Sequence, residues 1–342
     1  MNESFAPPCP AKVSRLMARR CRAPLRAARV LLTSIAMAAL EIGSAIDPAS
    51  AAETPKSPAA APAPAAAVPV PRVKPTDFEA HTFDDGAGHT LPYRVFFPRG
   101  LTAGQKVPVV VFLHGSGGRG TDNLHQLTDQ PAPLVFVQPE NQARWPVIMV
   151  APQCPPDQQW VAMPWGAPSG KGRRPPGPTW PLAATLALVD RLAADLPAVD
   201  KTRLYVTGMS MGGFGTFDAV ARAPRKWRAA VPICGGYDED QVAALVGVPL
   251  WAFHAEDDPT VPVARSRDVI AALRARGSHP RYTEYPASAH HGHFSWNPAY
   301  ADPDLLPWMF GPHPAPDAKA APARGAAPAV APSAPSPPPR AK

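Results

Sequence analysis

The sequence predicts an α/β fold with a mostly parallel central sheet and helices on both faces. Three observations carry this prediction. Residues 77–310 have the length of one large domain with a real core. Apolar runs without polar alternation recur along this stretch, as expected for strands that are covered on both faces. Helical periodicity separates some of these runs, and strands that alternate with helices form parallel sheets.

The first 51 residues are predicted to be a secretory signal peptide. Residues 1–29 hold seven basic residues and one acid, and the apolar run 30–40 follows them. Ala49-Ser50-Ala51 then provides a small-residue cleavage site. The apolar run is too short to cross a bilayer, which needs roughly 20 apolar residues. An uncleaved membrane anchor is the alternative, and Met17 is an alternative start to Met1. The expected location is the periplasm or the extracellular space.

Proline and charge separate the flanks from the domain. The chain has 49 prolines in 342 residues, and those in 52–76 and 311–342 alternate with alanine. Such segments bury too little apolar area to fold, so we expect a disordered linker and a disordered tail. The net charge is +7, and residues 1–51, the linker and the tail carry +4, +2 and +3 of it. The domain is left with −2, which argues against nucleic acid as a partner.

The elements of the domain can be assigned in order along the chain. Residues 78–83 and 91–97 alternate and are bounded by glycine and proline, which predicts an antiparallel hairpin. The expected buried strands are 107–113, 146–151, 203–208, 228–233 and 249–254. One helix is predicted by the spacing of Leu182, Leu186, Val189, Leu192 and Leu196. A second is predicted by Val263, Arg267, Ile270 and Leu273. No stretch of the domain is long and apolar enough to span a membrane.

Residues 155–180 follow no period and are predicted to be a surface insertion, with a lid beside a binding site as one interpretation. Its tryptophans, Trp160, Trp165 and Trp180, either line a pocket or pin the loop to the body. Cleavage of the signal peptide would leave two cysteines, Cys154 and Cys234. A disulfide between them and separate burial of two thiols both remain open.

The strongest motif is Gly208-Met209-Ser210-Met211-Gly212, directly after the strand 203–208. The pattern G-x-S-x-G between a strand and a helix is a nucleophile elbow. Glycines suit it because the turn leaves no room for side chains beside a strained serine. A helix that begins at Met211 aims its first N–H groups at developing negative charge.

A glycine-rich loop, residues 115–120, follows the strand 107–113. Its backbone N–H groups suit the other half of an oxyanion hole. The loop also matches the dinucleotide fingerprint G-x-G-x-x-G, with Glu140 about 20 residues further on. However, Glu140 lies in an expected loop rather than at the end of a second strand, and Thr121-Asp122 resembles a helix cap. We therefore expect no nucleotide cofactor.

Acid and histidine candidates follow the serine. Residues 253–262, "FHAEDDPTVP", end an apolar strand, and residues 289–296, "AHHGHFSW", come later. A serine hydroxyl is a poor nucleophile until a base takes its proton, and a carboxylate must orient that base. The order Ser, Asp, His is the chain order of the α/β-hydrolase triad.

The chain resembles exported bacterial α/β-hydrolases of the carboxylesterase and predicted-peptidase group, near the phospholipase/carboxylesterase and dienelactone hydrolase families. The resemblance covers about residues 90–310 and implies the α/β-hydrolase fold. The segments that carry it are "LHGSGGRGTDN", "VAPQCP" with Trp160, "GMSMGGFGT", "FHAEDDPTVP" and "GHFSWNPAYADPDLLPWM".

Placed on the family motifs, the resemblance implies Ser210 as the nucleophile, His293 as the base and Asp258 as the acid that orients it. The alternatives are Asp257 for the acid and His290 or His291 for the base. The implied oxyanion hole consists of the N–H of Met211 and one from Ser116 or Gly117. Gly118 stands where many relatives have an acid, which leaves the role of Arg119 open.

The implied activity is hydrolysis of small or polymeric carboxylic esters through an acyl-enzyme. A serine peptidase on the same scaffold and a binding protein without activity are the alternatives. No metal is expected, because no carboxylate or cysteine stands at ligand spacing from the histidines. The resemblance implies no cofactor. The sequence does not specify an oligomeric state.

Overall fold

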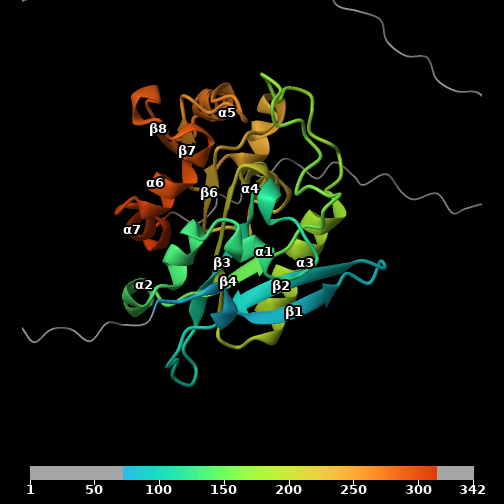
Figure 1. Cartoon of the computed structure of the whole chain (residues 1–342), viewed down its shortest axis with the longest axis vertical. Coiled ribbons are helices and arrows are strands. Elements are labelled where there is room, and N and C mark those ends of the chain that lie inside the picture. Colours follow the sequence, from blue (N-terminus) through green and yellow to red (C-terminus); the bar gives the residue numbers. More distant parts are fainter. Residues whose placement is uncertain (1–71, 314–342) are drawn as a thin grey trace, which may run out of the picture. The chain divides into compact units, whose positions relative to one another are not determined.

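An eight-stranded sheet with the order β1-β2-β4-β3-β5-β6-β7-β8 runs through the domain (Figure 1). The computed structural model describes residues 72–313, so the predicted signal peptide, nearly all of the linker and the tail lie outside the described residues. The strands are β1 (Glu79–Asp84), β2 (Thr90–Phe96), β3 (Val107–Leu113), β4 (Ile148–Pro152), β5 (Val199–Met209), β6 (Ala229–Ile233), β7 (Trp251–Ala255) and β8 (Arg281–Tyr285). Pairings from β4 through β3 to β8 are parallel, and those of β1 with β2 and β2 with β4 are antiparallel. The predicted hairpin and mostly parallel sheet are therefore confirmed.

The central strands are buried on both faces, as their unbroken apolar runs predict. Along β3, Val109 and Val111 join one hydrophobic cluster while Val110 and Phe112 join the other. Because successive side chains of a strand point to opposite faces, these two clusters are the two cores of a three-layer fold.

Helices cover both faces of the sheet. They are α1 (His125–Thr128), α2 (Pro139–Arg144), α3 (Trp180–Asp195), α4 (Met211–Arg222), α5 (Ala264–Arg274), α6 (Trp296–Ala301) and α7 (Leu305–Phe310). Side chains of α3, α4 and α5 fill the first cluster, and those of α6 and α7 fill the second. Figure 1 shows α6 and α7 together at one side of the sheet. The two long predicted helices correspond to α3 and α5, and no helix in the described part of the chain is long and apolar enough to cross a membrane.

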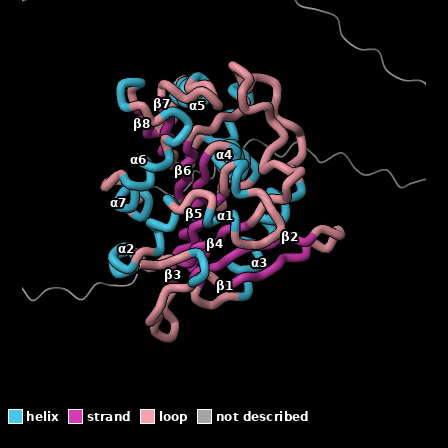
Figure 2. The backbone as a smooth tube through the Cα atoms, viewed as in Figure 1, coloured by secondary structure: helices cyan, strands magenta, loops and turns pink. Residues whose placement is uncertain are grey.

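The stretch from 155 to 179 contains no helix or strand, as its lack of period predicts (Figure 2). Buried acids of the body hold it in place. The carboxylate of Asp238 accepts hydrogen bonds from the backbone N–H groups of Gly172 (3.0 Å) and Arg174 (3.1 Å). The Nε of the Arg174 side chain donates a hydrogen bond to Oδ1 of Asp218 on α4, at 2.7 Å. The segment is thus an ordered loop on the outside of α4.

Trp160 pins this loop rather than lining a pocket. Its side chain is fully buried, and its indole N–H donates to the His114 carbonyl oxygen at 3.0 Å. Trp180 begins α3 and stacks on His89 of the β1–β2 turn, with ring centroids 4.6 Å apart. Trp165 and Trp180 are both half-buried, and Trp165 lies in the middle of the loop.

Candidate active site

Ser210 occupies a strained turn between β5 and α4. Its φ of 55° lies in the left-handed region, which is unfavourable for a residue with a side chain and marks a constrained turn. Glycine is required beside it: a Cβ at Gly212 would lie 1.8 Å from the Leu113 carbonyl oxygen, and one at Gly208 would lie 2.6 Å from the same atom. The predicted elbow geometry is therefore present, with Ser210 at the carboxyl end of β5.

A chain of hydrogen bonds joins Ser210 to a histidine and a carboxylate. The Ser210 Oγ lies 2.8 Å from His293 Nε2, and His293 Nδ1 lies 2.8 Å from Asp258 Oδ2. Since an ionised carboxylate only accepts, Nδ1 carries the proton and Nε2 is free to accept from the serine hydroxyl. This is the tautomer that a general base for Ser210 needs.

Asp258 is held as a carboxylate. Burial alone would raise its pKa, but hydrogen bonds from His254, His293 and the Val261 N–H outweigh burial and bring the pKa well below its usual range. The Oδ1 atom also accepts the Thr260 N–H at 2.8 Å. The carboxylate is therefore ionised and fixed in orientation across the neutral pH range.

The alternative acid and bases lie elsewhere. The Asp257 carboxylate accepts the Gly292 N–H at 3.0 Å, so it holds the loop that carries His293 rather than the ring itself. The His290 side chain is exposed, and His291 packs edge-on against Tyr285. The structure brings Ser210, His293 and Asp258 together, and it places Asp257, His290 and His291 outside that chain of hydrogen bonds.

Two loops place free N–H groups near the serine. A Cβ built on Gly115 would lie 3.7 Å from the Ser210 Cβ, so the 115–118 loop lies against the elbow. Within residues 72–313, the N–H groups of Met211, Ser116 and Gly117 have no acceptor. The three predicted donors are thus available for a negatively charged oxygen.

His114 orients one of these donors. Its Nε2 accepts the Cys154 N–H at 2.9 Å, so Nδ1 carries the proton and donates to the Gly115 carbonyl oxygen at 2.6 Å. That carbonyl belongs to the same peptide group as the Ser116 N–H. Burial lowers the pKa of His114 to about 4, which keeps this ring neutral and the peptide plane fixed. In contrast, the Asp129 carboxylate lies directly against Gly117, which makes the Ser116 N–H the better site for negative charge.

Arg119 holds the same loop from the outside. Its Nε donates to the Ser116 carbonyl oxygen and one Nη donates to the Pro156 carbonyl oxygen, both at 3.0 Å. The side chain therefore links the glycine-rich loop to the start of the 155–179 loop, which answers the open question of its role.

The two cysteines are free thiols, so the disulfide alternative is wrong. Burial raises the pKa of Cys154 to about 12 and raises that of Cys234 above the usual range. Atoms of Cys234, Asp258 and His293 lie within 4.8 Å of one another, close enough to share a metal ion. However, a thiol held protonated is a poor ligand, and both nitrogens of His293 are already hydrogen-bonded. The arrangement suits proton transfer better than metal binding.

Aromatic side chains border His293. Trp296 packs edge-on against the His293 ring, with centroids 5.2 Å apart, and its indole N–H donates to the Gln130 Oε1. Phe294 packs on Trp296 but leaves 54% of its own surface exposed. It is the one exposed large apolar side chain in residues 72–313. An apolar contact surface therefore lies next to the histidine.

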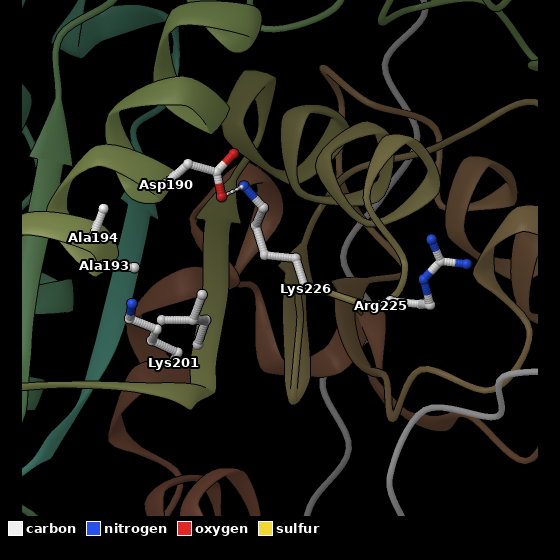
Figure 3. Close-up of a pocket in the computed structure, with 7 residues that line it drawn as sticks. Asp190, Ala193, Ala194, Lys201, Arg225 and Lys226 are labelled. Atoms are coloured by element: carbon white, nitrogen blue, oxygen red, sulfur yellow. Dashed lines mark hydrogen bonds and ion pairs between the residues drawn. The ribbon is translucent and has the colours of Figure 1, made fainter.

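A hollow of about 410 Å³ lies at the opposite end of β5 (Figure 3). It is lined by Asp190, Ala193, Ala194, Lys201, Leu204, Arg225 and Lys226. Lys226 Nζ forms an ion pair with Asp190 Oδ1 at 2.6 Å, whereas Arg225 points away from that pair (Figure 3). Catalytic groups of open α/β sheets gather at the carboxyl ends of the strands, whereas this hollow borders the amino end.

Sequence reasoning missed three side chains around the site. His114 and His254 each stand at the end of an apolar strand, and Cys234 follows β6. The signal for the histidines was a lone polar residue that ends an otherwise apolar run, which indicates a buried and hydrogen-bonded ring. Nothing in the sequence indicates that the Ser210 N–H lies 3.2 Å from the Cys234 Sγ.

Comparison with known proteins finds one matching family and several similar solved structures. Residues 182–304 match the model of the dienelactone hydrolase family. The crystal structure of a thermostable esterase aligns with a TM-score of 0.64 and 40% sequence identity over 69% of this chain, and this chain spans 63% of the length of that esterase. An acylaminoacyl peptidase from Pyrococcus horikoshii aligns with a TM-score of 0.47 and 16% identity, over 68% of this chain and 41% of that one. No curated protein sequence shows significant similarity to the chain.

Proposed function

We propose that this α/β-hydrolase, whose residues 182–304 match the dienelactone hydrolase family, is a serine hydrolase that cleaves carboxylic esters through an acyl-enzyme. The observation that carries the proposal is the continuous chain of hydrogen bonds from Ser210 through His293 to Asp258. It starts at a serine whose φ is positive, as an elbow requires.

The first half of the reaction acylates the serine. The Ser210 Oγ attacks the ester carbonyl carbon while His293 Nε2 takes the hydroxyl proton. The imidazolium that forms is stabilised by the Asp258 carboxylate. The oxyanion accepts hydrogen bonds from the N–H groups of Met211 and Ser116, and loss of one such donor costs about 3 kcal/mol of transition-state stabilisation. His293 then returns the proton to the departing alcohol.

The second half removes the acyl group. His293 takes a proton from a water molecule, whose oxygen attacks the acyl carbon, and the collapse of the second oxyanion releases the acid and restores the Ser210 hydroxyl. The exposed Phe294 beside the base provides apolar contact for the acyl or alcohol group, which favours esters with apolar substituents. The 40% identity to an esterase supports esters over peptides as substrates.

The test is Ser210→Ala. We expect hydrolysis of p-nitrophenyl butyrate to fall by at least a factor of about 10⁴ while the circular dichroism spectrum and the melting temperature stay near wild type. A fluorophosphonate probe should label wild type and spare the variant. The matched control is Ser278→Ala, a half-buried serine on the connection before β8, which should keep activity and labelling.

Two results would contradict the proposal. Retention of ester hydrolysis by the folded Ser210→Ala variant would remove Ser210 from the reaction. Faster turnover of peptide anilides than of matched p-nitrophenyl esters by the wild-type protein would favour the peptidase alternative.

A further inference from the structure

A second histidine, besides His293, contacts the carboxylate of Asp258. His254 lies near the end of β7 and is fully buried. Its Nε2 lies 3.3 Å from Asp258 Oδ2 and 3.0 Å from the Val261 carbonyl oxygen. Its Nδ1 lies 2.8 Å from the Ser266 Oγ of α5. Every polar atom of this ring is therefore engaged, although none of its contacts reaches Ser210.

The partners of the ring determine where its protons lie. Nε2 must carry a proton, because the Val261 carbonyl oxygen can only accept. The Ser266 hydroxyl has one proton and two neighbours that could use it, namely His254 Nδ1 and the Gly235 carbonyl oxygen at 2.9 Å. If Ser266 donates to the carbonyl oxygen, Nδ1 must donate to Ser266. All contacts are then satisfied at once only when both ring nitrogens are protonated.

The charges that face the ring favour the same state. Asp258 lies on the turn after β7, and Glu284 of β8 is paired in register with His254 across the sheet. Glu284 is also bonded to Arg267 of α5, at 2.5 Å, and to the Tyr282 hydroxyl. The thiol of Cys234 from β6 is neutral, since burial raises its pKa. Burial alone disfavours a charged ring, but the Asp258 carboxylate 3.3 Å from Nε2, together with Glu284 on the neighbouring strand, offsets that cost and stabilises an imidazolium.

We propose that His254 is a positioning residue that is held as an imidazolium and shares the Asp258 carboxylate with His293. The inference rests on the proposed function, because it concerns the acid of that triad. The His254 ring fixes the Asp258 carboxylate through the contact of its Nε2 with Oδ2. Its positive charge also competes with an imidazolium at His293 for the same carboxylate, so its removal should change the pH dependence of the reaction.

The kinetic test compares pH profiles of kcat/KM for p-nitrophenyl butyrate. His254→Gln keeps a hydrogen-bond donor but removes the charge, so the acid limb of the profile should move upward by about one pH unit. Ser266→Ala removes the acceptor for the Nδ1 proton, so it should move the limb in the same direction by a smaller amount. His290→Gln, an exposed histidine outside the hydrogen-bond chain, should leave the limb in place. A merely structural role would lower kcat/KM evenly at all pH values, and that result would overturn the proposal.

A spectroscopic test covers the case in which these variants fail to fold. In Ser210→Ala protein labelled with ¹⁵N-histidine, one ring at pH 8 should show two protonated nitrogens and two N–H protons that are slow to exchange. A spectrum in which every ring keeps a single protonated nitrogen at pH 8 would overturn the proposal. This measurement needs no activity, so it decides on His254 even if Ser210 turns out not to be the nucleophile.

Discussion

His114 links the stability of the protein to the geometry of the glycine-rich loop 115–120. The ring is fully buried, and its two hydrogen bonds require one neutral tautomer. Burial lowers its pKa to about 4, whereas an exposed histidine titrates near 6.5. At pH values between these two, His114 is therefore protonated in the unfolded chain and neutral in the folded chain. Stability from this group is complete above about pH 6.5 and decreases as the pH falls toward 4.

We expect the unfolding equilibrium constant of the wild-type protein to rise by about tenfold per pH unit in this window through His114. His114→Gln should be less stable at pH 7.5 but should lose this share of the pH dependence, so the two stability curves converge toward pH 4. Urea unfolding at half-unit pH steps measures both curves. The exposed His279→Gln should keep the wild-type slope. Parallel curves for His114→Gln and wild type would show that His114 does not titrate in this way.

For individual residues, the sequence predicted which side chains of the candidate site lie together, but it did not predict the residues that surround them. The motif order led to Ser210, Asp258 and His293, and their side chains lie within hydrogen-bond distance. The roles of His114 and His254 depend on distant partners, Cys154 in the first case and Ser266 in the second. Such contacts join residues from different elements of the fold, and no local pattern in a single sequence specifies them.

Among the elements, the 155–179 loop depends on one buried acid for its attachment. The fully buried carboxylate of Asp218 on α4 pairs with Arg174 of the loop and with Arg222 of its own helix, each at 2.7 Å. The Arg222 guanidinium also donates to carbonyl oxygens of the loop, including that of Gly177 at 2.7 Å. Loss of the carboxylate would leave two partly buried guanidinium groups without their anion.

Asp218→Asn should therefore lower the free energy of unfolding by about 3 kcal/mol. The same change should speed tryptic cleavage after Lys171 and Arg173, because the loop would lose its attachment to α4. Urea unfolding and timed proteolysis with mass spectrometry measure the two effects. Asp190→Asn breaks the ion pair of Lys226 with the exposed Asp190 carboxylate and should cost less than about 1 kcal/mol. Equal losses in the two variants would argue against Asp218 as the attachment point.

The elements themselves were predictable to different degrees. The expected strand 107–113 coincides with β3, because a wholly apolar run has one interpretation at that length. By contrast, β8 was not predicted. Its residues Arg281–Tyr285 are exposed or half-buried at the edge of the sheet, so they leave no apolar run. Short helices such as α2 were missed as well, since six residues are too few to show a period.

For the whole molecule, the predicted fold is confirmed, and the charge partition separates the domain from its basic flanks. Because the flanks lie outside the described residues, export stays a proposal that rests on the sequence of residues 1–51. We propose that the chain is exported and cleaved after Ala51.

This proposal has a direct test. Protein recovered from the periplasm or the medium should begin at Ala52, as read by N-terminal mass spectrometry. Ala51→Asp should retain the precursor, because signal peptidases need a small residue there. The control Ala59→Asp lies beyond the cleavage site and should be processed normally. Recovery of uncleaved wild-type protein from the membrane fraction would favour the anchor.

The position of His293 after the last strand has a consequence for when activity arises in the life of the chain. During translation Ser210 is synthesised before His293, the proposed base, which lies 83 residues further along the chain. The base can reach it only once β8 and the C-terminal helices have docked, since Trp296 and Tyr300 pack into the core beside it. A nascent or partly folded chain thus carries an inert hydroxyl. Under the proposed function, ester hydrolysis therefore begins only after the C-terminal part of the domain has folded.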